Sequence, residues 1–192
     1  MASSINPKVA AVALDFDGIV VNVEVNWKEA LKLASTCSGQ EVKSLLTFYE
    51  QYFGTPLFAQ ASAEIEKMEI EALKRSPQVP YIAGFLKAVR QKKIPIYIVS
   101  MQTKRVIQGY LEEHGLAGFI KEVVGRERFP SKRAQVQYVI SQIAGGQVLF
   151  VDDLKRNLDS CRDLGVICSF FPRNQNAKDA KESWNRLLEL LN

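Results

Sequence analysis

The sequence predicts an α/β fold in which a parallel, Rossmann-like sheet forms the core and a small all-helical unit is inserted after the first strand. Three observations support this prediction. Short apolar runs alternate with segments of helical periodicity, the runs are apolar at almost every position, and residues 15–93 contain no convincing strand. Continuous apolarity indicates strands that are buried on both faces, which is typical of parallel sheets covered by helices.

Five apolar runs, rich in β-branched residues, are expected to form the sheet: Val9–Leu14, Ile94–Val99, Ile120–Val124, Gln147–Val151 and Val166–Phe171. Helices with one apolar face are expected over Ile82–Lys93, Thr103–His114, Lys132–Ala144 and Ala177–Leu191. Ser131 is well placed as an N-cap, and Gly165 is expected to end a further helical stretch before the last strand. This alternation of strands and helices implies right-handed crossovers.

The inserted unit is expected to span residues 23–79, so that residues 1–22 and 80–192 make up the core domain. Helical stretches are expected over Val25–Ser35, Gln40–Phe53 and Pro56–Arg75. Pro77 and Pro80 then mark the return of the chain to the core. We expect this unit to lie as a cap over one edge of the sheet, with its own aromatic residues, Tyr49, Tyr52, Phe53 and Phe58, packed inside it.

Composition and charge exclude several classes of protein. Of the 192 residues, 47% are hydrophobic and 24% are charged, and the net charge is +4. This charge suits a globular protein that binds small anions, whereas a dedicated nucleic-acid-binding protein would be more basic. No segment approaches the roughly 18 apolar residues of a membrane span, and residues 1–8 do not resemble a signal peptide, so a soluble, cytoplasmic protein is expected. The three cysteines lack the spacing of a zinc site and are expected to be reduced.

Polar side chains stand directly after several of the expected strands. They are Asp15 and Asp17 after the first strand, Ser100 after the second, Asp152 and Asp153 after the fourth, and Lys132 at the start of the helix that leads to the fourth. Ligands of open α/β sheets bind outside the carboxyl ends of the strands, so these groups are expected to converge on one crevice. Carboxylates with open positions around them predict a Mg²⁺ site.

This set of groups suits phosphoryl transfer. A carboxylate can attack a phosphate ester and form an acyl phosphate. Lys132 and Ser100 can hold the non-bridging oxygens, because the reaction needs mainly positioning and charge stabilisation. The single histidine, His114, lies near the end of an expected helix, so general acid catalysis is expected to fall to Asp17, on the same side of the chain as the first carboxylate. Gly18 lets the backbone turn sharply beside the ligand.

The same residues stand in the order and spacing of a known family. The segment Val-Ala-Leu-Asp15-Phe-Asp17-Gly resembles the first motif of the haloacid dehalogenase-like (HAD) hydrolases. The later motifs of that family resemble, in order, Ile-Tyr-Ile-Val-Ser100, Lys132 and Asp152-Asp153-Leu-Lys-Arg-Asn157. The resemblance covers the whole chain, including a helical cap between the first and second motifs.

The resemblance implies a role for each matching residue. Asp15 would be the nucleophile and a metal ligand, and Asp17 the acid/base catalyst, which binds the metal through its backbone carbonyl. Asp153 would ligate Mg²⁺, Asp152 would help directly or through water, and Asn157 would orient the pair. Ser and Lys of the second and third motifs would hold the phosphoryl oxygens.

Two positions depart from the family pattern. Leu154 stands where the family often has serine, in a supporting position. Lys132 is followed by Arg133 instead of the common proline, so this is the weakest of the motif matches, and Lys104 is an alternative source of the ammonium group.

The expected activity is therefore hydrolysis of a phosphomonoester of a small metabolite, through an aspartyl-phosphate. Dehalogenation is disfavoured because it needs neither Mg²⁺ nor the additional aspartates. A phosphomutase stays open, as does a phosphonatase that recruits a cap lysine such as Lys28, Lys32 or Lys43. A receiver-like phosphoacceptor module and a non-catalytic binding protein are further alternatives. The expected partner is a small phosphorylated metabolite, with no nucleic acid or membrane, and monomer and homodimer are both open.

Overall fold

The computed structural model describes residues 8–192, and residues 1–7, which the sequence analysis assigned to the core, lie outside the described part of the chain. Five strands form one sheet, in which every neighbouring pair is parallel: β1 (Val9–Leu14), β2 (Ile96–Val99), β3 (Glu122–Val124), β4 (Gln147–Asp152) and β5 (Ile167–Phe170). Their order across the sheet is β3-β2-β1-β4-β5, so the first strand lies at the centre.

Helices cover both faces of this sheet. One face packs against α6 (Lys132–Ser141) and α7 (Lys155–Asp159), through an apolar cluster that includes Ala13 and Phe150. The other face packs against α4 (Ile82–Gln91), α5 (Lys104–Glu113) and α8 (Ala177–Glu189), through a cluster that includes Leu14 and Val151. Successive residues of one strand thus belong to different clusters, and the expected α/β, Rossmann-like core is confirmed.

Several boundaries differ from the expected ones for local reasons. β2 begins at Ile96 and not at Ile94, because Pro95 has no N–H for the ladder, although its carbonyl accepts from the Val12 N–H at 2.9 Å. The expected N-cap is present, since Ser131 accepts a hydrogen bond from the backbone of α6. Gly165 adopts φ +73° and follows a 3₁₀ turn, Arg162–Leu164, that continues from α7, and a second such turn, Ala117–Phe119, precedes β3.

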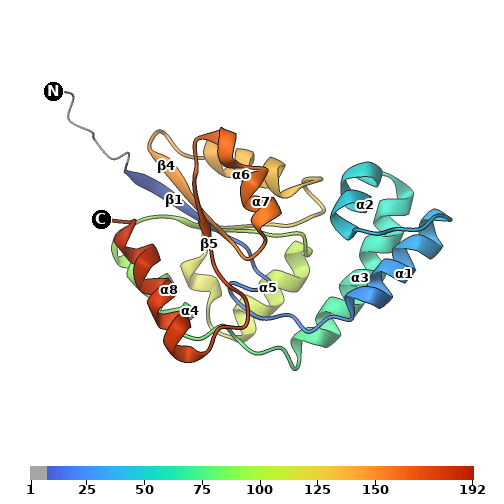
Figure 1. Ribbon diagram of the computed structural model, residues 1–192, viewed down its shortest axis with the longest axis horizontal. Coiled ribbons are helices and arrows are strands. Elements are labelled where there is room, and N and C mark those ends of the chain that lie inside the picture. Colours follow the sequence, from blue (N-terminus) through green and yellow to red (C-terminus); the bar gives the residue numbers. More distant parts are fainter. Residues whose placement is uncertain (1–7) are drawn as a thin grey trace.

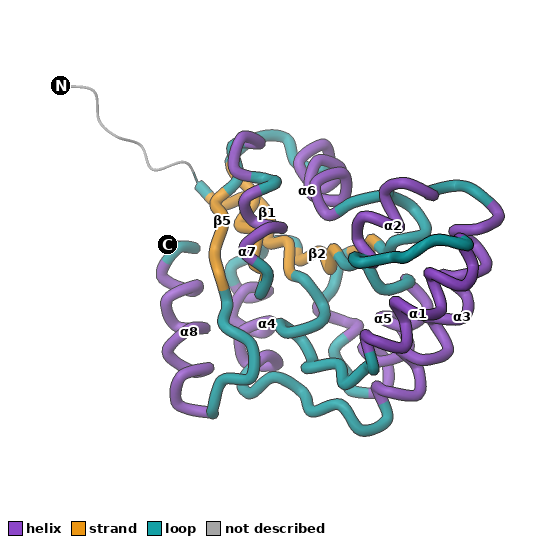
Figure 2. The backbone as a smooth tube through the Cα atoms, turned by 45° about the vertical axis from the view of Figure 1, so that its right-hand side comes forward, coloured by secondary structure: helices purple, strands orange, loops and turns teal. Residues whose placement is uncertain are grey.

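Three further helices, α1 (Trp27–Ser38), α2 (Leu45–Tyr52) and α3 (Pro56–Leu73), form a separate group beyond the carboxyl ends of the strands (Figures 1 and 2). We call this group the α1–α3 unit. It has its own apolar cluster, in which Phe48, Tyr49 and Phe58 are buried. The helix expected from Gln40 begins only at Leu45, because Ser44 caps it and accepts a hydrogen bond from Thr47. Among the described residues, no helix combines the length and the apolar character that a membrane crossing requires.

The two segments that connect the α1–α3 unit to the sheet domain run side by side. Val79 donates a backbone hydrogen bond to Val20 at 3.0 Å, and Asn22 donates one to Pro77 at the same distance. Val21 and Gln78 form an antiparallel bridge between these two bonds. The chain therefore leaves and re-enters the sheet domain at one place.

Candidate active site

Asp15 is held firmly at the end of the central strand. Its backbone N–H donates to the carbonyl of Val151 on the neighbouring strand, at 2.9 Å. Its Oδ1 atom accepts from the hydroxyl of Ser100 at 2.8 Å, from Nζ of Lys132 at 2.8 Å and from the N–H of Phe16 at 2.7 Å. Oδ2 makes no hydrogen bond to any residue in the range 8–192. One oxygen of this carboxylate is thus oriented by three donors, and the other is available to a ligand.

Lys132 is the ammonium group of the site. It is buried, donates to the carbonyl of Val99 at 2.7 Å, and lies 3.5 Å from Oδ2 of Asp152 as well as against Asp15. Burial opposes its charge, but the two carboxylates outweigh that effect and raise the pKa of Lys132. Lys104, the alternative considered from the sequence, is exposed at the start of α5 and does not line the cavity described below.

Three carboxylates from two strands meet beside this ammonium group. One oxygen each from Asp15, Asp152 and Asp153 can be chosen so that all three lie within 4.8 Å of one another. Asn157 orients Asp152, since its amide donates to both carboxylate oxygens, at 3.1 and 3.0 Å, and the Leu154 N–H donates to Oδ1 at 2.8 Å. Burial, together with the neighbouring Asp15, raises the pKa values of Asp152 and Asp153 to about 7. The raised pKa values indicate that the cluster holds more negative charge than the nearby cations neutralise.

Asp17 lies beside this cluster, but its side chain is not part of it. Its Oδ1 atom accepts from the Val23 N–H at 2.8 Å and from the guanidinium of Arg173, which also lies 3.5 Å from Oδ2 of Asp153. Burial raises the pKa of Asp17, and Arg173 opposes the shift. Arg173 was not among the residues predicted from the sequence, although it stands just beyond the fifth strand, at the same edge of the sheet as the predicted residues.

Gly18 is required where the chain turns out of the first strand. It adopts φ +83°, and a Cβ atom built at this position would lie 2.4 Å from Oδ2 of Asp153. A side chain would therefore displace one of the clustered carboxylates, in addition to straining the backbone. The backbone turns sharply here and closely approaches the carboxylate of Asp153.

The donor set fits a divalent cation. Among the described residues, the four aspartates of the site form ion pairs with two cations, Lys132 and Arg173, so the six groups carry an excess of two negative charges when all are ionised: Asp15, Asp17, Asp152, Asp153, Lys132 and Arg173. Ligand oxygens that share an octahedral Mg²⁺ at roughly 2.1 Å are at most about 4.2 Å apart. The clustered oxygens lie within 4.8 Å of one another, so at most a small movement of the carboxylates is needed for all three to bind one ion.

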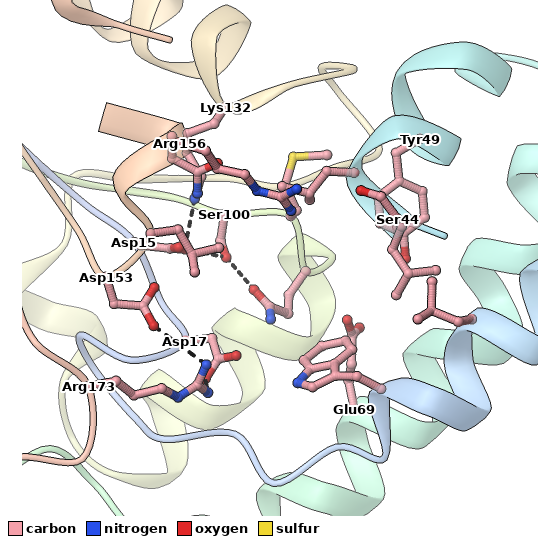
Figure 3. Close-up of a pocket in the computed structure, with 18 of the residues that line it drawn as sticks. Asp15, Asp17, Ser44, Tyr49, Glu69, Ser100, Lys132, Asp153, Arg156 and Arg173 are labelled. Carbon is pink, nitrogen blue, oxygen red and sulfur yellow. Dashed lines mark hydrogen bonds and ion pairs between the residues drawn. The ribbon is translucent and has the colours of Figure 1, made fainter. Parts of the chain in front are cut away.

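A cavity of about 350 Å³ separates these residues from the α1–α3 unit (Figure 3). Asp15, Asp17, Ser100, Lys132 and Asp153 line it from the sheet side. The opposite wall comes from α1, the segment before α2, and α2, and it includes Trp27, Leu31, Leu45, Leu46 and Tyr49. Reacting groups and an apolar wall from a different part of the chain thus enclose one volume, as is typical of small-molecule sites.

A buried ion pair joins the sheet domain to the α1–α3 unit. Arg126, in the loop after β3, is fully buried and donates through Nη1 to both oxygens of Glu69 on α3, at 2.7 and 2.9 Å. It also donates to Ser62, through Nε to the hydroxyl and through Nη2 to the carbonyl, and to the carbonyl of Met101. We call this arrangement the Arg126–Glu69 tie. Burial raises the pKa of Glu69 to about 7, against the opposing effect of Arg126.

Comparisons with known proteins point to one family. The chain matches the family described as haloacid dehalogenase-like hydrolases over residues 12–170. Its structure resembles a HAD-superfamily hydrolase of subfamily IA from Geobacter sulfurreducens, with 15% identity, 100% of both chains covered and a TM-score of 0.64. It also resembles a haloacid dehalogenase-like family protein from Streptococcus pneumoniae (16% identity, 96% of this chain and 99% of that chain, TM-score 0.62). A third similar structure, from Haemophilus somnus, is named a predicted phosphoglycolate phosphatase (15% identity, 96% and 98%, TM-score 0.59). A search of curated proteins found no match.

Proposed function

Since this chain belongs to the haloacid dehalogenase-like hydrolases, we propose that it is a Mg²⁺-dependent phosphatase that hydrolyses a phosphomonoester of a small metabolite. The observation that carries the proposal is the contact of Asp15 with both Ser100 and Lys132, beside two further aspartates. A nucleophile, two groups suited to phosphoryl oxygens and a set of metal ligands then share one cavity. The name of the Haemophilus somnus protein is consistent with this reading.

In the proposed reaction, a carboxylate oxygen of Asp15 attacks phosphorus and the bond to the leaving-group oxygen breaks. The ammonium group of Lys132 and the hydroxyl of Ser100 stabilise the charge on the non-bridging oxygens. Asp17 gives its proton to the leaving group, a role that suits a buried carboxyl whose pKa is raised. The same carboxylate then takes a proton from the water that hydrolyses the aspartyl-phosphate, which restores Asp15 and releases phosphate.

The metal would be held by Asp15 and Asp153, with the backbone carbonyl of Asp17 as a further ligand and Asp152 acting directly or through water. When bound, Mg²⁺ supplies positive charge to the phosphoryl group and offsets the repulsion between the carboxylates. Asn157 keeps Asp152 oriented for this role. We further propose that the α1–α3 unit is the cap that keeps bulk water from the reacting groups, and that the protein works in the cytoplasm.

The proposal is tested by the release of phosphate from p-nitrophenyl phosphate and from a panel of phosphorylated metabolites, with Mg²⁺ and with EDTA. We expect metal-dependent multiple turnover that is lost in Asp15→Asn. It should persist in Asp159→Asn, which changes an exposed aspartate that is paired with Arg162. Phosphorylation without turnover would favour a phosphoacceptor module instead. The absence of phosphate chemistry on every substrate would refute the proposal.

A second reaction type can be tested in the same way. Of the lysines considered for a phosphonatase, Lys43 lines the cavity. It is largely exposed and paired with Glu41, whereas a lysine that forms a Schiff base needs a desolvated environment. We therefore expect Lys43→Met to retain phosphatase activity, and we expect no cleavage of carbon–phosphorus bonds.

A further inference from the structure

The cavity is lined by a residue whose buried hydroxyl group has no hydrogen-bond partner among residues 8–192. Tyr49 is 2% exposed, and its Oη atom makes no hydrogen bond within the described part of the chain. Its ring is fixed by Phe58, edge-on at 5.7 Å between centroids, and by the guanidinium of Arg126, 5.3 Å from the ring centroid. Buried hydroxyls are normally paired, because leaving one unpaired is costly. The hydroxyl is therefore fixed in direction, and its hydrogen-bonding capacity is unused within residues 8–192.

A free cation faces this hydroxyl from the other side of the cavity. Arg156, on α7, makes no side-chain hydrogen bond or ion pair to any residue from 8 to 192, and its guanidinium extends from the sheet domain towards Tyr49 (Figure 3). It also lines an adjoining cavity of about 250 Å³. Nearby arginines are engaged elsewhere, since Arg133 pairs with Asp163 and Arg162 pairs with Asp159.

The acidic groups on this side of the cavity do not neutralise Arg156. Glu69 lines the cavity, but its carboxylate is held by Arg126 in the buried tie. Glu50 lines the adjoining cavity and is exposed, and the structure contains no ion pair between it and Arg156. The positive charge thus remains available to a ligand.

From this pair we infer that Tyr49 and Arg156 form a subsite for the leaving group, and that the substrate is a small phosphomonoester with a second oxyanion, either a carboxylate or a second phosphate. The inference rests on the proposed function. The phosphoryl group would lie against Asp15, Ser100 and Lys132, and the second oxyanion would bind the guanidinium of Arg156 and accept a hydrogen bond from Tyr49. The apolar side chains of the opposite wall would contact the short carbon chain between the two anionic groups.

Four probe substrates test the contributions of Arg156 and Tyr49 separately, because they differ in the group at the end opposite the phosphate ester. In 2-phosphoglycolate this group is a carboxylate, in ethane-1,2-diol bisphosphate a second phosphate, and in 2-hydroxyethyl phosphate a neutral hydroxyl. Ethyl phosphate has no polar group there. We expect the wild-type protein to prefer one of the two doubly anionic substrates. Arg156→Gln should lower kcat/KM for that substrate by about 10- to 100-fold and that for 2-hydroxyethyl phosphate by less than about 3-fold. Tyr49→Phe should lower kcat/KM for the preferred doubly anionic substrate and for 2-hydroxyethyl phosphate by about 3- to 10-fold, and should leave kcat/KM for ethyl phosphate unchanged.

Matched variants and a stability measurement distinguish binding from a structural role. The matched controls are Tyr52→Phe, on the same helix as Tyr49, and Arg162→Gln, on the same side of the sheet domain as Arg156. Neither Tyr52 nor Arg162 lines the cavity, so both variants should behave as wild type. Tyr49→Phe should keep or raise the melting temperature, because it removes an unpaired buried hydroxyl. Equal losses on charged and neutral substrates in Arg156→Gln, or no preference in the wild-type protein, would overturn the subsite while leaving the phosphatase proposal intact. Failure of all phosphomonoesters would overturn both.

Discussion

The Arg126–Glu69 tie provides a quantitative test of how the α1–α3 unit is attached to the sheet domain. Replacing Arg126 by methionine keeps an apolar chain of similar reach but leaves Glu69 buried without its cation and removes the donors to Ser62 and Met101. Breaking a fully buried pair by removing one partner costs about 3–5 kcal/mol. We expect the free energy of unfolding of Arg126→Met to fall by this amount at pH 8.

The loss should depend on pH, with a sign that follows from the pKa of Glu69. Burial raises this pKa from its ordinary value of 4.5 to about 7 even with Arg126 present, and removing the guanidinium raises it further. A group whose pKa is raised in the folded state binds more protons there than in the unfolded state, so stability falls as pH rises from about 4.5 through the folded-state pKa. The deficit of Arg126→Met relative to the wild-type protein should therefore be smaller at pH 5 than at pH 8, by at least about 1 kcal/mol.

Urea unfolding followed by tryptophan fluorescence at both pH values measures these quantities. Arg105→Met is the matched control, because Arg105 forms an exposed pair with Glu66 across the same junction and should lose less than about 1 kcal/mol. Adding Glu69→Leu to Arg126→Met should recover most of the lost stability, since the unpaired buried charge is then gone. A loss in Arg126→Met no larger than that of the control, or an equal deficit at both pH values, would refute the reasoning.

Three further predictions concern the acidic cluster. Gly18→Ala should weaken Mg²⁺ binding, measured by calorimetry, because the new Cβ collides with Asp153; unchanged affinity would contradict this. Mg²⁺ affinity should rise between about pH 6 and pH 8, because Asp152 and Asp153 have pKa values near 7 without metal and must lose protons to bind it. Calorimetry in buffers of different ionisation enthalpy should detect the released protons. An Mg²⁺ affinity that does not change with pH would contradict this prediction. Asn157→Ala should cost about 1–3 kcal/mol of stability in urea unfolding and should weaken Mg²⁺ binding, because it removes both amide contacts to Asp152. A variant with wild-type stability and wild-type Mg²⁺ affinity would exclude the orienting role of Asn157.

The sequence predicted the sheet core well because its strands are buried on both faces and leave a continuous apolar signal. Their ends were less certain, since a single residue such as Pro95 decides where hydrogen bonding begins. The helix expected from Gln40 shows the same limit, because the side chain of Ser44 starts it five residues later.

The candidate site could be predicted as far as its residues follow strand ends. Asp15, Ser100 and Lys132 lie together because the carboxyl ends of parallel strands share one edge of the sheet. The position of Tyr49 could not be derived in this way, and Arg173 stands three residues beyond the end of the fifth strand, in a loop. Each depends on where a loop or a distant helix places a side chain in space, and neither apolar periodicity nor motif spacing contains that information.

The paired connecting segments have a consequence for how such a protein can diversify. Because the backbones of Val20 and Val79 are hydrogen-bonded to each other, the segment between them is an insertion whose two ends lie side by side. A short turn, or a foreign module of different size, could replace it without moving the central strand that carries Asp15. The replacement would also have to provide a carboxylate for Arg126, or that arginine would have to be changed at the same time. The α1–α3 unit can therefore be exchanged only if the Arg126–Glu69 tie is kept or removed as a pair.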